Sequence, residues 1–348
     1  MELIKVKEVK NAEIVHYNDG VKLITSYFNK VSISINDNLI TKIVLKEHFF
    51  NNLLGHFRIL RRFLRLDKCN IYPVGENLII IRQGKVYYYD GILKKISETL
   101  TLKNCRNILH QSISSTPDGF IYFGEYGNNK KRNPVPLYRS KDGGKSWENI
   151  YTFEAGKIKH IHGCYYDKYE DKVWVCTGDF KDENWLVTAD RDFKSLEFIG
   201  NGQQIFRTCN LIFKEQEVHW LMDSQLEESF HIKMNRSDRT ITKLSGFPGP
   251  VWYIKEFNDG IILAGTANEK GEGVFDNKAH LFASNDLLNW QEILAIEHDN
   301  FPKGYFKFGV IGFPDGLQTA EDGFYLFFEA LKKHDGKSFL YKLKQNQL

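Results

Sequence analysis

A phrase of turn and strand residues recurs seven times along the chain. Each copy joins a polar turn containing Gly, Asp or Asn to a run of β-branched and aromatic residues, which is the pattern of a β-hairpin. The turns centre on positions 19, 76, 118, 170, 216, 259 and 322. Their steps of 42 to 63 residues are close to the ~40–50 residues of a four-stranded propeller blade, with two steps lengthened by insertions.

This long period predicts an all-β fold, a β-propeller of four-stranded blades that takes up residues 1–348 as a single domain. Seven blades account for all seven turns, and six blades remain open if the sparse first repeat is a partial blade. A β-sandwich is disfavoured, because its strands recur every ~8–12 residues without a longer period.

Composition excludes several classes of protein. The 348 residues are 42% hydrophobic and 26% charged, and no apolar run approaches the ~18 residues of a membrane span, so we expect a soluble globular chain without a transmembrane segment. The 47 basic and 44 acidic residues give a net charge of +3, which is too balanced for a domain that binds nucleic acid.

The cysteines and the N-terminal sequence both bear on the compartment. The five cysteines include no CxxC pair and predict reduced, mostly buried thiols: Cys69, Cys105, Cys164, Cys176 and Cys209. The N-terminal residues lack the ~7–15-residue apolar stretch of a signal peptide. Both features predict a cytoplasmic protein.

One segment departs from the β pattern and predicts a short amphipathic helix inserted at residues 45–66. Its apolar face is formed by Leu53, Phe57, Leu60 and Leu64. Its basic face is formed by Arg58, Arg61, Arg62 and Arg65. The favoured interpretation packs the apolar face on the propeller and leaves the arginines in water, because residues 50–65 contain neither Trp nor Lys to anchor a bilayer contact. The alternative is contact of the arginines with a membrane surface or a polyanion.

A turn at residues 140–147 has a mechanism that can be read from its residue types. Asp142 can accept hydrogen bonds from backbone N–H groups, Gly144 can adopt positive φ, and Trp147 can cover the hairpin. With Ser140, these residues complete the pattern S-x-D-x-G-x-[ST]-W, which resembles the Asp box of sialidase-like propellers. Weaker copies begin at Thr188 and Ser284.

The resemblance to Asp-box (BNR) repeat proteins extends over about residues 105–316 and implies a sialidase-like or glycosyl-hydrolase-like β-propeller. True sialidases use three arginines, an early F-R-I-P phrase and a Tyr–Glu pair. Here the nearest phrase, Phe57 to Leu60, lacks the proline and lies in the expected helix. Sialic-acid hydrolysis is therefore disfavoured, and the family label rests on the fold.

Polar residues stand at two recurring positions of the repeat, before the first strand and after the second. This placement predicts that they converge at the mouth of the propeller channel. The catalytic candidates are Glu125, His160, His162, Asp179 and Asp223. The candidates for substrate binding are Gln204, Arg207, Trp252 and Tyr253. Each has a structural alternative: the carboxylates as turn caps, Arg207 as a salt bridge to Asp179 or Asp223, and the two rings as core.

His160 and His162 are the residues that most suggest a metal. Residues i and i+2 of a strand point to the same face, so the two imidazoles project together. Joined by His110 and Gln204, they form a tentative site for a divalent ion, similar in kind to the His and Gln ligands of propeller lyases that act on oligogalacturonate. Such an ion would neutralise a uronate carboxylate and acidify the adjacent carbon. The alternative is a pair of polar core residues bonded to backbone carbonyls.

Two hypotheses of different classes follow. The first is a carbohydrate-active enzyme, a glycoside hydrolase or lyase, which acts on an acidic glycan or sugar derivative at the channel mouth. The second is a non-catalytic propeller that binds a glycan or a protein, for example in surface-polysaccharide assembly. A purely structural assembly factor is disfavoured, because it would fill the mouth with apolar side chains.

Overall fold

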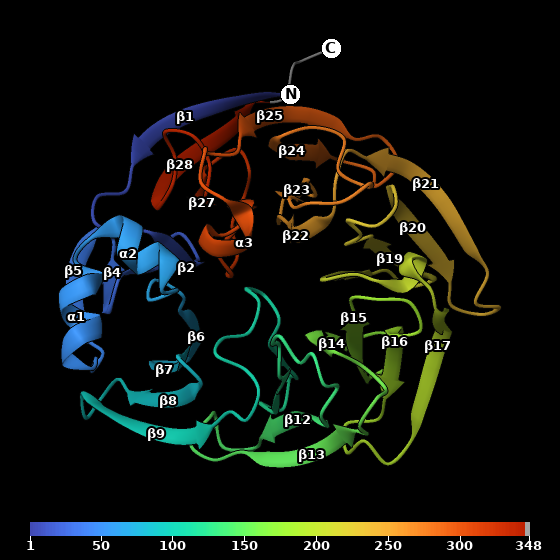
Figure 1. Cartoon of the computed structure of the whole chain (residues 1–348), viewed down its shortest axis with the longest axis horizontal. Helices are drawn as coiled ribbons and strands as arrows, with labels where there is room; N and C mark the ends of the chain where they lie inside the picture. The colour runs from blue at the N-terminus through green and yellow to red at the C-terminus, as the bar shows by residue number, and fades with distance from the viewer. Residues whose placement is uncertain (345–348) are drawn as a thin grey trace. The chain divides into compact units, whose positions relative to one another are not determined.

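The computed structural model describes residues 1–344, and its secondary structure is almost entirely antiparallel β (Figure 1). The chain divides into two compact units. One unit is Asn70–Trp252, and the other joins Met1–Cys69 to the chain from Tyr253 onward. The single domain expected over residues 1–348 stays a prediction.

The unit Asn70–Trp252 consists of four-stranded antiparallel sheets in which the strands lie in chain order. The first sheet is β6 (Asn70–Val74), β7 (Asn77–Arg82), β8 (Lys85–Asp90) and β9 (Lys95–Thr101), and the second is β10 (Ser114–Ser115), β11 (Ile121–Gly124), β12 (Val135–Ser140) and β13 (Glu148–Phe153). The third sheet is β14 (His160–Asp167), β15 (Lys172–Gly178), β16 (Asn184–Ala189) and β17 (Leu196–Gly202). The fourth is β18 (Leu211–Phe213), β19 (Glu217–Leu221), β20 (Ser229–Asn235) and β21 (Ile241–Phe247). A short 3-10 turn, η1 (Gln204–Phe206), leads from β17 to β18.

The other unit holds a four-stranded sheet and a larger one. The first is β2 (Ile14–Asn18), β3 (Lys22–Tyr27), β4 (Lys30–Ile35) and β5 (Asn38–Val44). The strands of the larger sheet are β1 (Glu2–Glu8), β22 (Val251–Glu256), β23 (Ile262–Asn268), β24 (Lys278–Ser284), β25 (Gln291–Glu297), β26 (Gly309–Gly312), β27 (Phe324–Glu329) and β28 (Lys337–Lys344). Two residue pairs, Ala267–Val310 and Asn268–Gly309, join β23 to β26. The larger sheet therefore consists of two sets, β22–β25 and β26–β28 with β1.

Each of the seven predicted turns lies between the first and second strands of such a set. The turns centred on 19, 76, 118, 170, 216, 259 and 322 fall at β2/β3, β6/β7, β10/β11, β14/β15, β18/β19, β22/β23 and β26/β27. The predicted repeat of strand, turn and strand is therefore confirmed. A β-propeller predicts this arrangement, because each blade is one four-stranded antiparallel sheet.

Burial falls from the second strand of a set to the fourth. Every residue of β23 and β27 is buried, whereas β9 is mostly exposed. The sequence explains the difference, because a near-continuous apolar run can pack on both faces while a run rich in Lys, Glu and Thr can cover only one. Polar residues at the ends of the inner strands therefore stand on a rigid core.

The first strand of the chain completes the last set. β1 pairs antiparallel with β28 from Glu2–Lys344 to Glu8–Phe339, with an irregularity between Lys5 and Lys7. This pairing joins segments that are more than 300 residues apart in sequence, and Figure 1 shows β1 along the outer edge of β28. β1 thereby covers a strand edge that would otherwise be unpaired.

The turn at residues 140–147 has the hydrogen bonds that its residue types predict. Asp142 Oδ1 accepts from Ser140 Oγ at 2.8 Å and from Ser146 N at 2.9 Å, and Gly144 adopts a φ of 94°. Trp147 packs edge-to-face on Phe123, with ring centroids 4.9 Å apart. The turn joins β12 to β13 and is structural.

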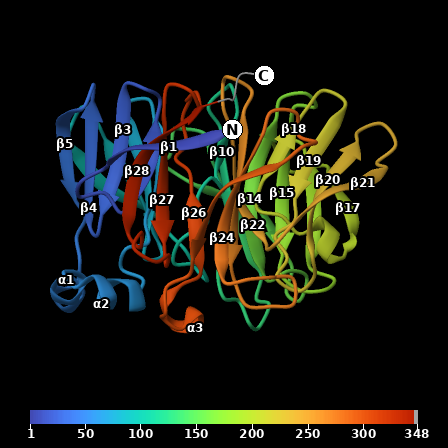
Figure 2. The ribbon, with the colours of Figure 1, turned by 90° about the horizontal axis from the view of Figure 1, so that it is seen from above.

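The amphipathic segment differs from the sequence prediction. It forms α1 (Phe49–Gly55) and α2 (Arg58–Phe63), which lie with α3 (Lys303–Phe306) at one end of the strands of their unit (Figure 2). Arg61 and Arg62 are buried, whereas Leu53 and Phe57 are more than half exposed. The expectation of an apolar face on the core and arginines in water is therefore wrong, and so is the alternative of membrane contact through Arg61 and Arg62.

Carboxylates beneath the helices cause this inversion. Arg61 Nη2 lies 2.5 Å from Glu13 Oε1, and Arg58 pairs with Asp67 at 2.6 Å and Asp335 at 2.7 Å. Arg62 pairs with Asp299 and donates to the backbone oxygen of Phe306, which ties α2 to α3. A buried guanidinium needs such partners, since its desolvation is costly unless it is paired.

We expect Glu13→Gln to lower the free energy of unfolding by about 3 kcal/mol or more, because it removes the charged partner of a guanidinium that is only 2% exposed. Glu2→Gln removes an exposed carboxylate and should change stability by less than about 0.5 kcal/mol. Urea unfolding of both variants measures the difference. Equal effects would contradict the structural role of this ion pair.

Candidate functional site

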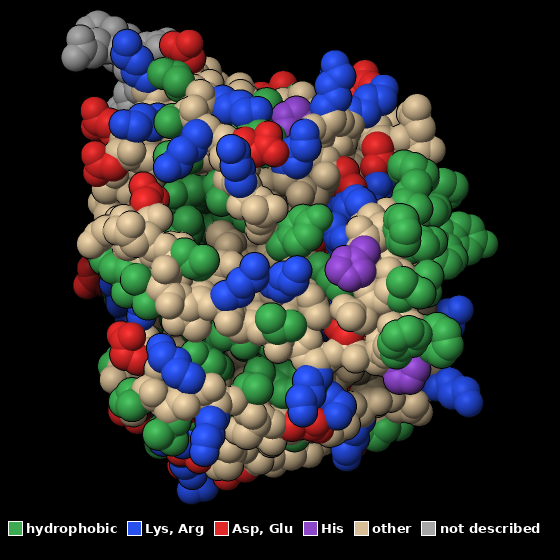
Figure 3. Space-filling view, turned by 90° about the vertical axis from the view of Figure 1, so that its left-hand side faces the viewer, with side chains coloured by type: hydrophobic (Ala, Val, Ile, Leu, Met, Phe, Trp, Pro, Cys, Tyr) green, Lys and Arg blue, Asp and Glu red, His purple; other side chains and the backbone are tan. Residues whose placement is uncertain are grey.

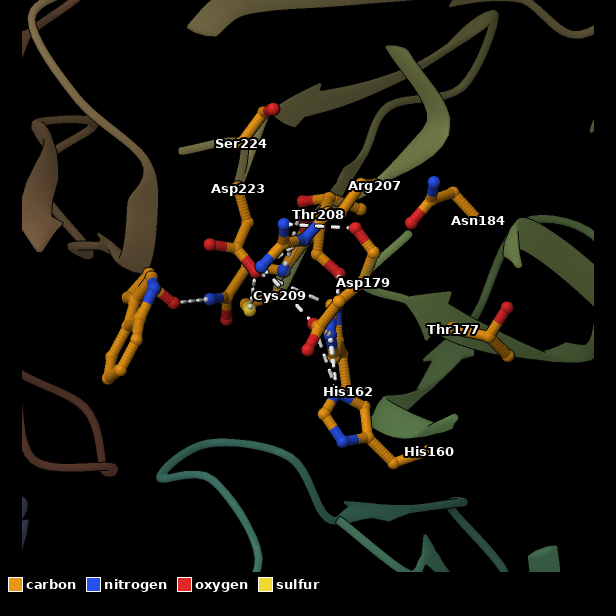
Figure 4. Close-up of polar contacts among 12 residues, drawn as sticks. His160, His162, Thr177, Asp179, Asn184, Arg207, Thr208, Cys209, Asp223 and Ser224 are labelled. Atoms are coloured by element: carbon orange, nitrogen blue, oxygen red, sulfur yellow. Dashed lines mark hydrogen bonds and ion pairs between the residues drawn. The ribbon is translucent and has the colours of Figure 1, made fainter. Parts of the chain in front are cut away.

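Two histidines at the start of β14 form the centre of the candidate site. His160 and His162 project to the same side of the strand, as the sequence predicts, and their Nε2 atoms lie 3.1 Å apart (Figure 4). Both side chains are buried. The whole cluster lies within the unit Asn70–Trp252.

Asp179 joins the two imidazoles. Its Oδ1 atom lies 3.1 Å from the Nε2 of His160 and 3.1 Å from the Nε2 of His162. The residue directly follows β15, where Gly178 allows a close approach of the chain: a Cβ at that position would stand 2.2 Å from Asn184 Oδ1. Gly178 is therefore part of what places Asp179 against β14.

The backbone fixes which imidazole nitrogens carry protons. His160 Nδ1 lies 2.8 Å from the carbonyl oxygen of Gly127, and His162 Nδ1 lies 3.0 Å from that of Thr208. A carbonyl oxygen can only accept a hydrogen bond, so each Nδ1 must be the donor. In the neutral imidazoles both Nε2 lone pairs then point toward Asp179 Oδ1. Three electron-rich atoms within 3.1 Å of one another repel unless a proton or a metal ion lies between them.

Arg207 links Asp179 to a second carboxylate. Its Nη2 lies 3.2 Å from Asp179 Oδ1, and its Nε lies 3.3 Å from Asp223 Oδ2. Asp223 follows β19, and its other oxygen, Oδ1, is buried without a hydrogen-bond partner among residues 1–344. The structural alternative for Arg207, a salt bridge to these aspartates, is thus present. Asp223 Oδ1 can still accept a proton.

Burial and charge act in opposite directions on the central carboxylate. Burial alone would raise the pKa of Asp179, but its interactions with His160, Arg207 and His162 hold it well below its usual value. Burial lowers the pKa of His160, and the attraction of Asp179 only partly offsets this. His160 is therefore biased toward the neutral form, which can bind a metal ion.

Gln204 connects this cluster to a cavity. Its Nε2 donates to the backbone oxygen of Asp179 at 2.9 Å, and its Oε1 accepts from Ser224 Oγ at 2.8 Å. These bonds use both polar atoms of its amide on protein partners. The cavity has a volume of about 600 Å³ and is lined by Lys181, Gln203, Gln204, Ile205, Glu227 and Lys243.

Two further candidates lie apart from the ligand cluster. Both oxygens of Glu125 accept backbone N–H bonds, from Lys103 at 2.7 Å and Asn104 at 2.8 Å, and Tyr138 also donates to it. This is the turn-cap alternative for a strand-end carboxylate. His110 Nδ1 lies 3.4 Å from Asn70 Nδ2, and His110 is absent from the clusters of potential metal ligands in the described chain.

The predicted aromatic platform is not brought into this cluster as a pair. The backbone oxygen of Trp252 accepts from Asn210 Nδ2 at 2.6 Å, which attaches the end of this unit to the loop that carries Arg207. Tyr253 begins the other unit and is buried there.

Cys209 extends the cluster on the side of Asp223. Its Sγ lies 3.2 Å from Asp223 Oδ2, and His162 Nδ1 lies 3.8 Å from the same oxygen. Because His162 Nδ1 already donates to the carbonyl of Thr208, it is not open to an ion on this side. Burial and the neighbouring carboxylate raise the pKa of Cys209 well above its usual value. The thiol therefore stays protonated at neutral pH, which disfavours it as a metal ligand or nucleophile.

Sequence reasoning missed two residues of the site. Lys159 forms an ion pair with Asp179 Oδ2, and the ring of Tyr126 packs on His160 with centroids 4.2 Å apart. Each directly follows or precedes a candidate in the chain: Tyr126 comes after Glu125, and Lys159 comes before His160. Their position next to a candidate residue was the available signal.

Comparison with known proteins shows the fold. No family model matches the chain, and no curated protein sequence matches it. The extracellular domain of BT4673 from B. thetaiotaomicron is similar over 99% of this chain and 40% of its own, with a TM-score of 0.57 and 13% identity. The AfRom2 CNH domain is similar over 99% of this chain and 100% of its own, with a TM-score of 0.56 and 8% identity. A chain of the mitotic checkpoint complex is similar over 99% of this chain and 91% of its own, with a TM-score of 0.54 and 9% identity. These likenesses support the predicted β-propeller class.

The lowered pKa of His160 predicts a pH dependence of stability. An unfolded chain binds a proton at this residue near pH 6.5, whereas the folded chain binds it only at lower pH, so the free energy of unfolding falls as the pH drops below 6.5. Between pH 7.5 and 5.5 the wild-type free energy of unfolding should fall by up to about 1.4 kcal/mol because of His160, and His160→Gln should abolish this part of the fall. Urea unfolding at both values measures this, and an identical loss in the variant would contradict it.

Proposed function

We propose that the chain is a carbohydrate-active enzyme that acts on an acidic sugar or glycan with the help of a divalent metal ion. The observation that carries this proposal is the convergence of His160 Nε2, His162 Nε2 and Asp179 Oδ1 within 3.1 Å. Two imidazoles and one carboxylate form a common ligand set for divalent transition metals. The carbonyls that hold each Nδ1–H act as the outer partners that orient metal-bound histidines.

The metal would act as a Lewis acid on the substrate. Bound to a uronate carboxylate, it would lower the pKa of the carbon next to that group. The cavity beside Gln204 is lined by Lys181 and Lys243 against one carboxylate, Glu227, and this excess of positive charge suits an anionic glycan. Arg207 contacts both Asp179 and Asp223 and holds the two side chains in place.

Elimination is favoured over hydrolysis. Glycoside hydrolysis requires two carboxyl groups that act on the substrate. Here Asp179 and Glu125 use their oxygens on protein partners, whereas Asp223 Oδ1 has none among the described residues. Asp223 would accept the proton from the acidified carbon, the C–O bond at the neighbouring carbon would break with formation of a double bond, and the proton would pass from Asp223, directly or through solvent, to the leaving oxygen. The reaction consumes no water.

The test is a screen of uronate-containing oligosaccharides with purified protein loaded with Zn²⁺ or Mn²⁺. Mass spectrometry distinguishes the two reactions. The masses of the two elimination products add up to the mass of the substrate, whereas those of the two hydrolysis products add up to the substrate plus one water. We expect Asp223→Asn to lose turnover by about a hundredfold or more while it retains metal. His162→Ala should lose both metal and turnover.

A matched control separates the site from general charge effects. Asp238→Asn removes an exposed carboxylate of the same unit and should retain metal and turnover. Metal content is measured after dialysis by elemental analysis. A wild-type protein that binds no metal and cleaves no acidic glycan would overturn the proposal.

A second candidate is a non-catalytic propeller that binds a glycan or a protein. It is favoured by the burial of His160, His162 and Asp223 and by the existing partners of Asp179, which a substrate would have to displace. In that case Lys181→Ala and Lys243→Ala would weaken binding of an acidic glycan, and no cleavage product would form.

Two finer features belong to the same proposal. We propose seven blades, supported by the seven sets of strands, with the resemblance to Asp-box proteins supported by the bonds of Asp142. We also propose a cytoplasmic location, supported by the cysteines, which are free thiols in the described residues.

A further inference from the structure

The helices of the unit that contains both chain ends expose an unusual set of side chains. Six apolar residues of α1, α2 and the turn between them are between 47% and 72% exposed: Phe49, Phe50, Leu53, Phe57, Ile59 and Phe63. We call this set the aromatic face. Figure 3 shows hydrophobic side chains gathered along one edge of the molecule, where they project beyond their surroundings.

The size of the aromatic face is at the upper limit for a soluble chain without a partner. Its four phenylalanines alone expose roughly 500 Å². The largest apolar patch of a typical monomer is ~300–600 Å² and is often functional. α3 extends the apolar surface, because Phe306 packs on Phe63 with ring centroids 5.5 Å apart and Tyr305 is 68% exposed.

The ion pairs beneath the helices hold the aromatic face in place. Arg58, Arg61 and Arg62 turn inward to Glu13, Asp67, Asp299 and Asp335. The polar residues of the segment are thus used for anchoring, and its apolar residues are left outside. A surface that is already ordered loses little conformational entropy when it binds.

We propose that the aromatic face inserts into the interfacial region of an anionic lipid membrane. Residues 45–66 contain a single carboxylate, Glu47, against the basic residues Lys46, Arg58, Arg61, Arg62 and Arg65, so the segment carries no excess of negative charge that would repel anionic headgroups. Lys46, three residues before α1, is exposed, whereas Lys303 at the start of α3 is half-buried and donates to the backbone oxygen of Glu269. Lys46 is therefore the cation of this region that is open to a headgroup.

The shape of the face favours a membrane over a protein partner. Helices of seven and six residues are too short to span a bilayer, but projecting Phe, Leu and Ile side chains can enter its interface. No helix of residues 1–344 is long and apolar enough for a membrane span. A stable interface with a second copy needs about 800 Å² per partner and a complementary surface, which projecting side chains do not supply.

The test is sedimentation of the full chain with vesicles of phosphatidylcholine, with and without phosphatidylserine. We expect binding that is stronger with phosphatidylserine. A variant with Phe49→Ser, Phe50→Ser and Phe57→Ser should bind about tenfold more weakly or worse, because the apolar area that leaves water is reduced. These residues are exposed, so the variant should fold, and its thermal unfolding checks this.

A control variant carries Ile92→Ser and Leu93→Ser, which are 82% and 64% exposed at the turn between β8 and β9. It removes apolar surface elsewhere and should bind vesicles like the wild type. Equal binding by the triple variant, or absence of wild-type binding to both vesicles, would overturn the proposal. So would a wild-type dimer in light scattering that the triple variant converts to a monomer, because the face would then be a self-interface.

Discussion

Two hydrogen bonds from imidazole Nδ1 atoms to backbone carbonyls determine the chemistry of the candidate site. The carbonyls of Gly127 and Thr208 hold the protons of His160 and His162 on the far side of each ring. Both Nε2 lone pairs are consequently presented to Asp179, and the low pKa of that carboxyl keeps a negative charge beside them. The proposed binding of a metal ion depends on this arrangement.

The sequence predicts the strands and turns of the repeat well, because these depend on residues that are close together in the chain. Turn residues and alternating strands placed each of the seven turns, and the period of two in a strand placed His160 beside His162. The helical segment shows where local rules fail. Its spacing gives an apolar and a basic face, but which face turns inward depends on Glu13, Asp299 and Asp335, which are distant in sequence.

The candidate site was predictable in its residue types and less so in their roles. The sequence cannot distinguish Glu125 from Asp223, since both follow an inner strand. In the structure two backbone N–H groups engage Glu125, whereas one oxygen of Asp223 lacks a partner in the described chain. His110 and Gln204 likewise occupy the expected repeat positions but bond to other residues. Hydrogen-bond satisfaction is a property of the folded chain, so no pattern in the sequence reports it.

The most direct test of the account is a crystal structure of the protein grown with Zn²⁺, with anomalous diffraction recorded at the zinc edge. The account predicts a peak about 2.0–2.2 Å from His160 Nε2, His162 Nε2 and Asp179 Oδ1. Density without such a peak, with the three atoms in direct contact through a shared proton, would contradict it.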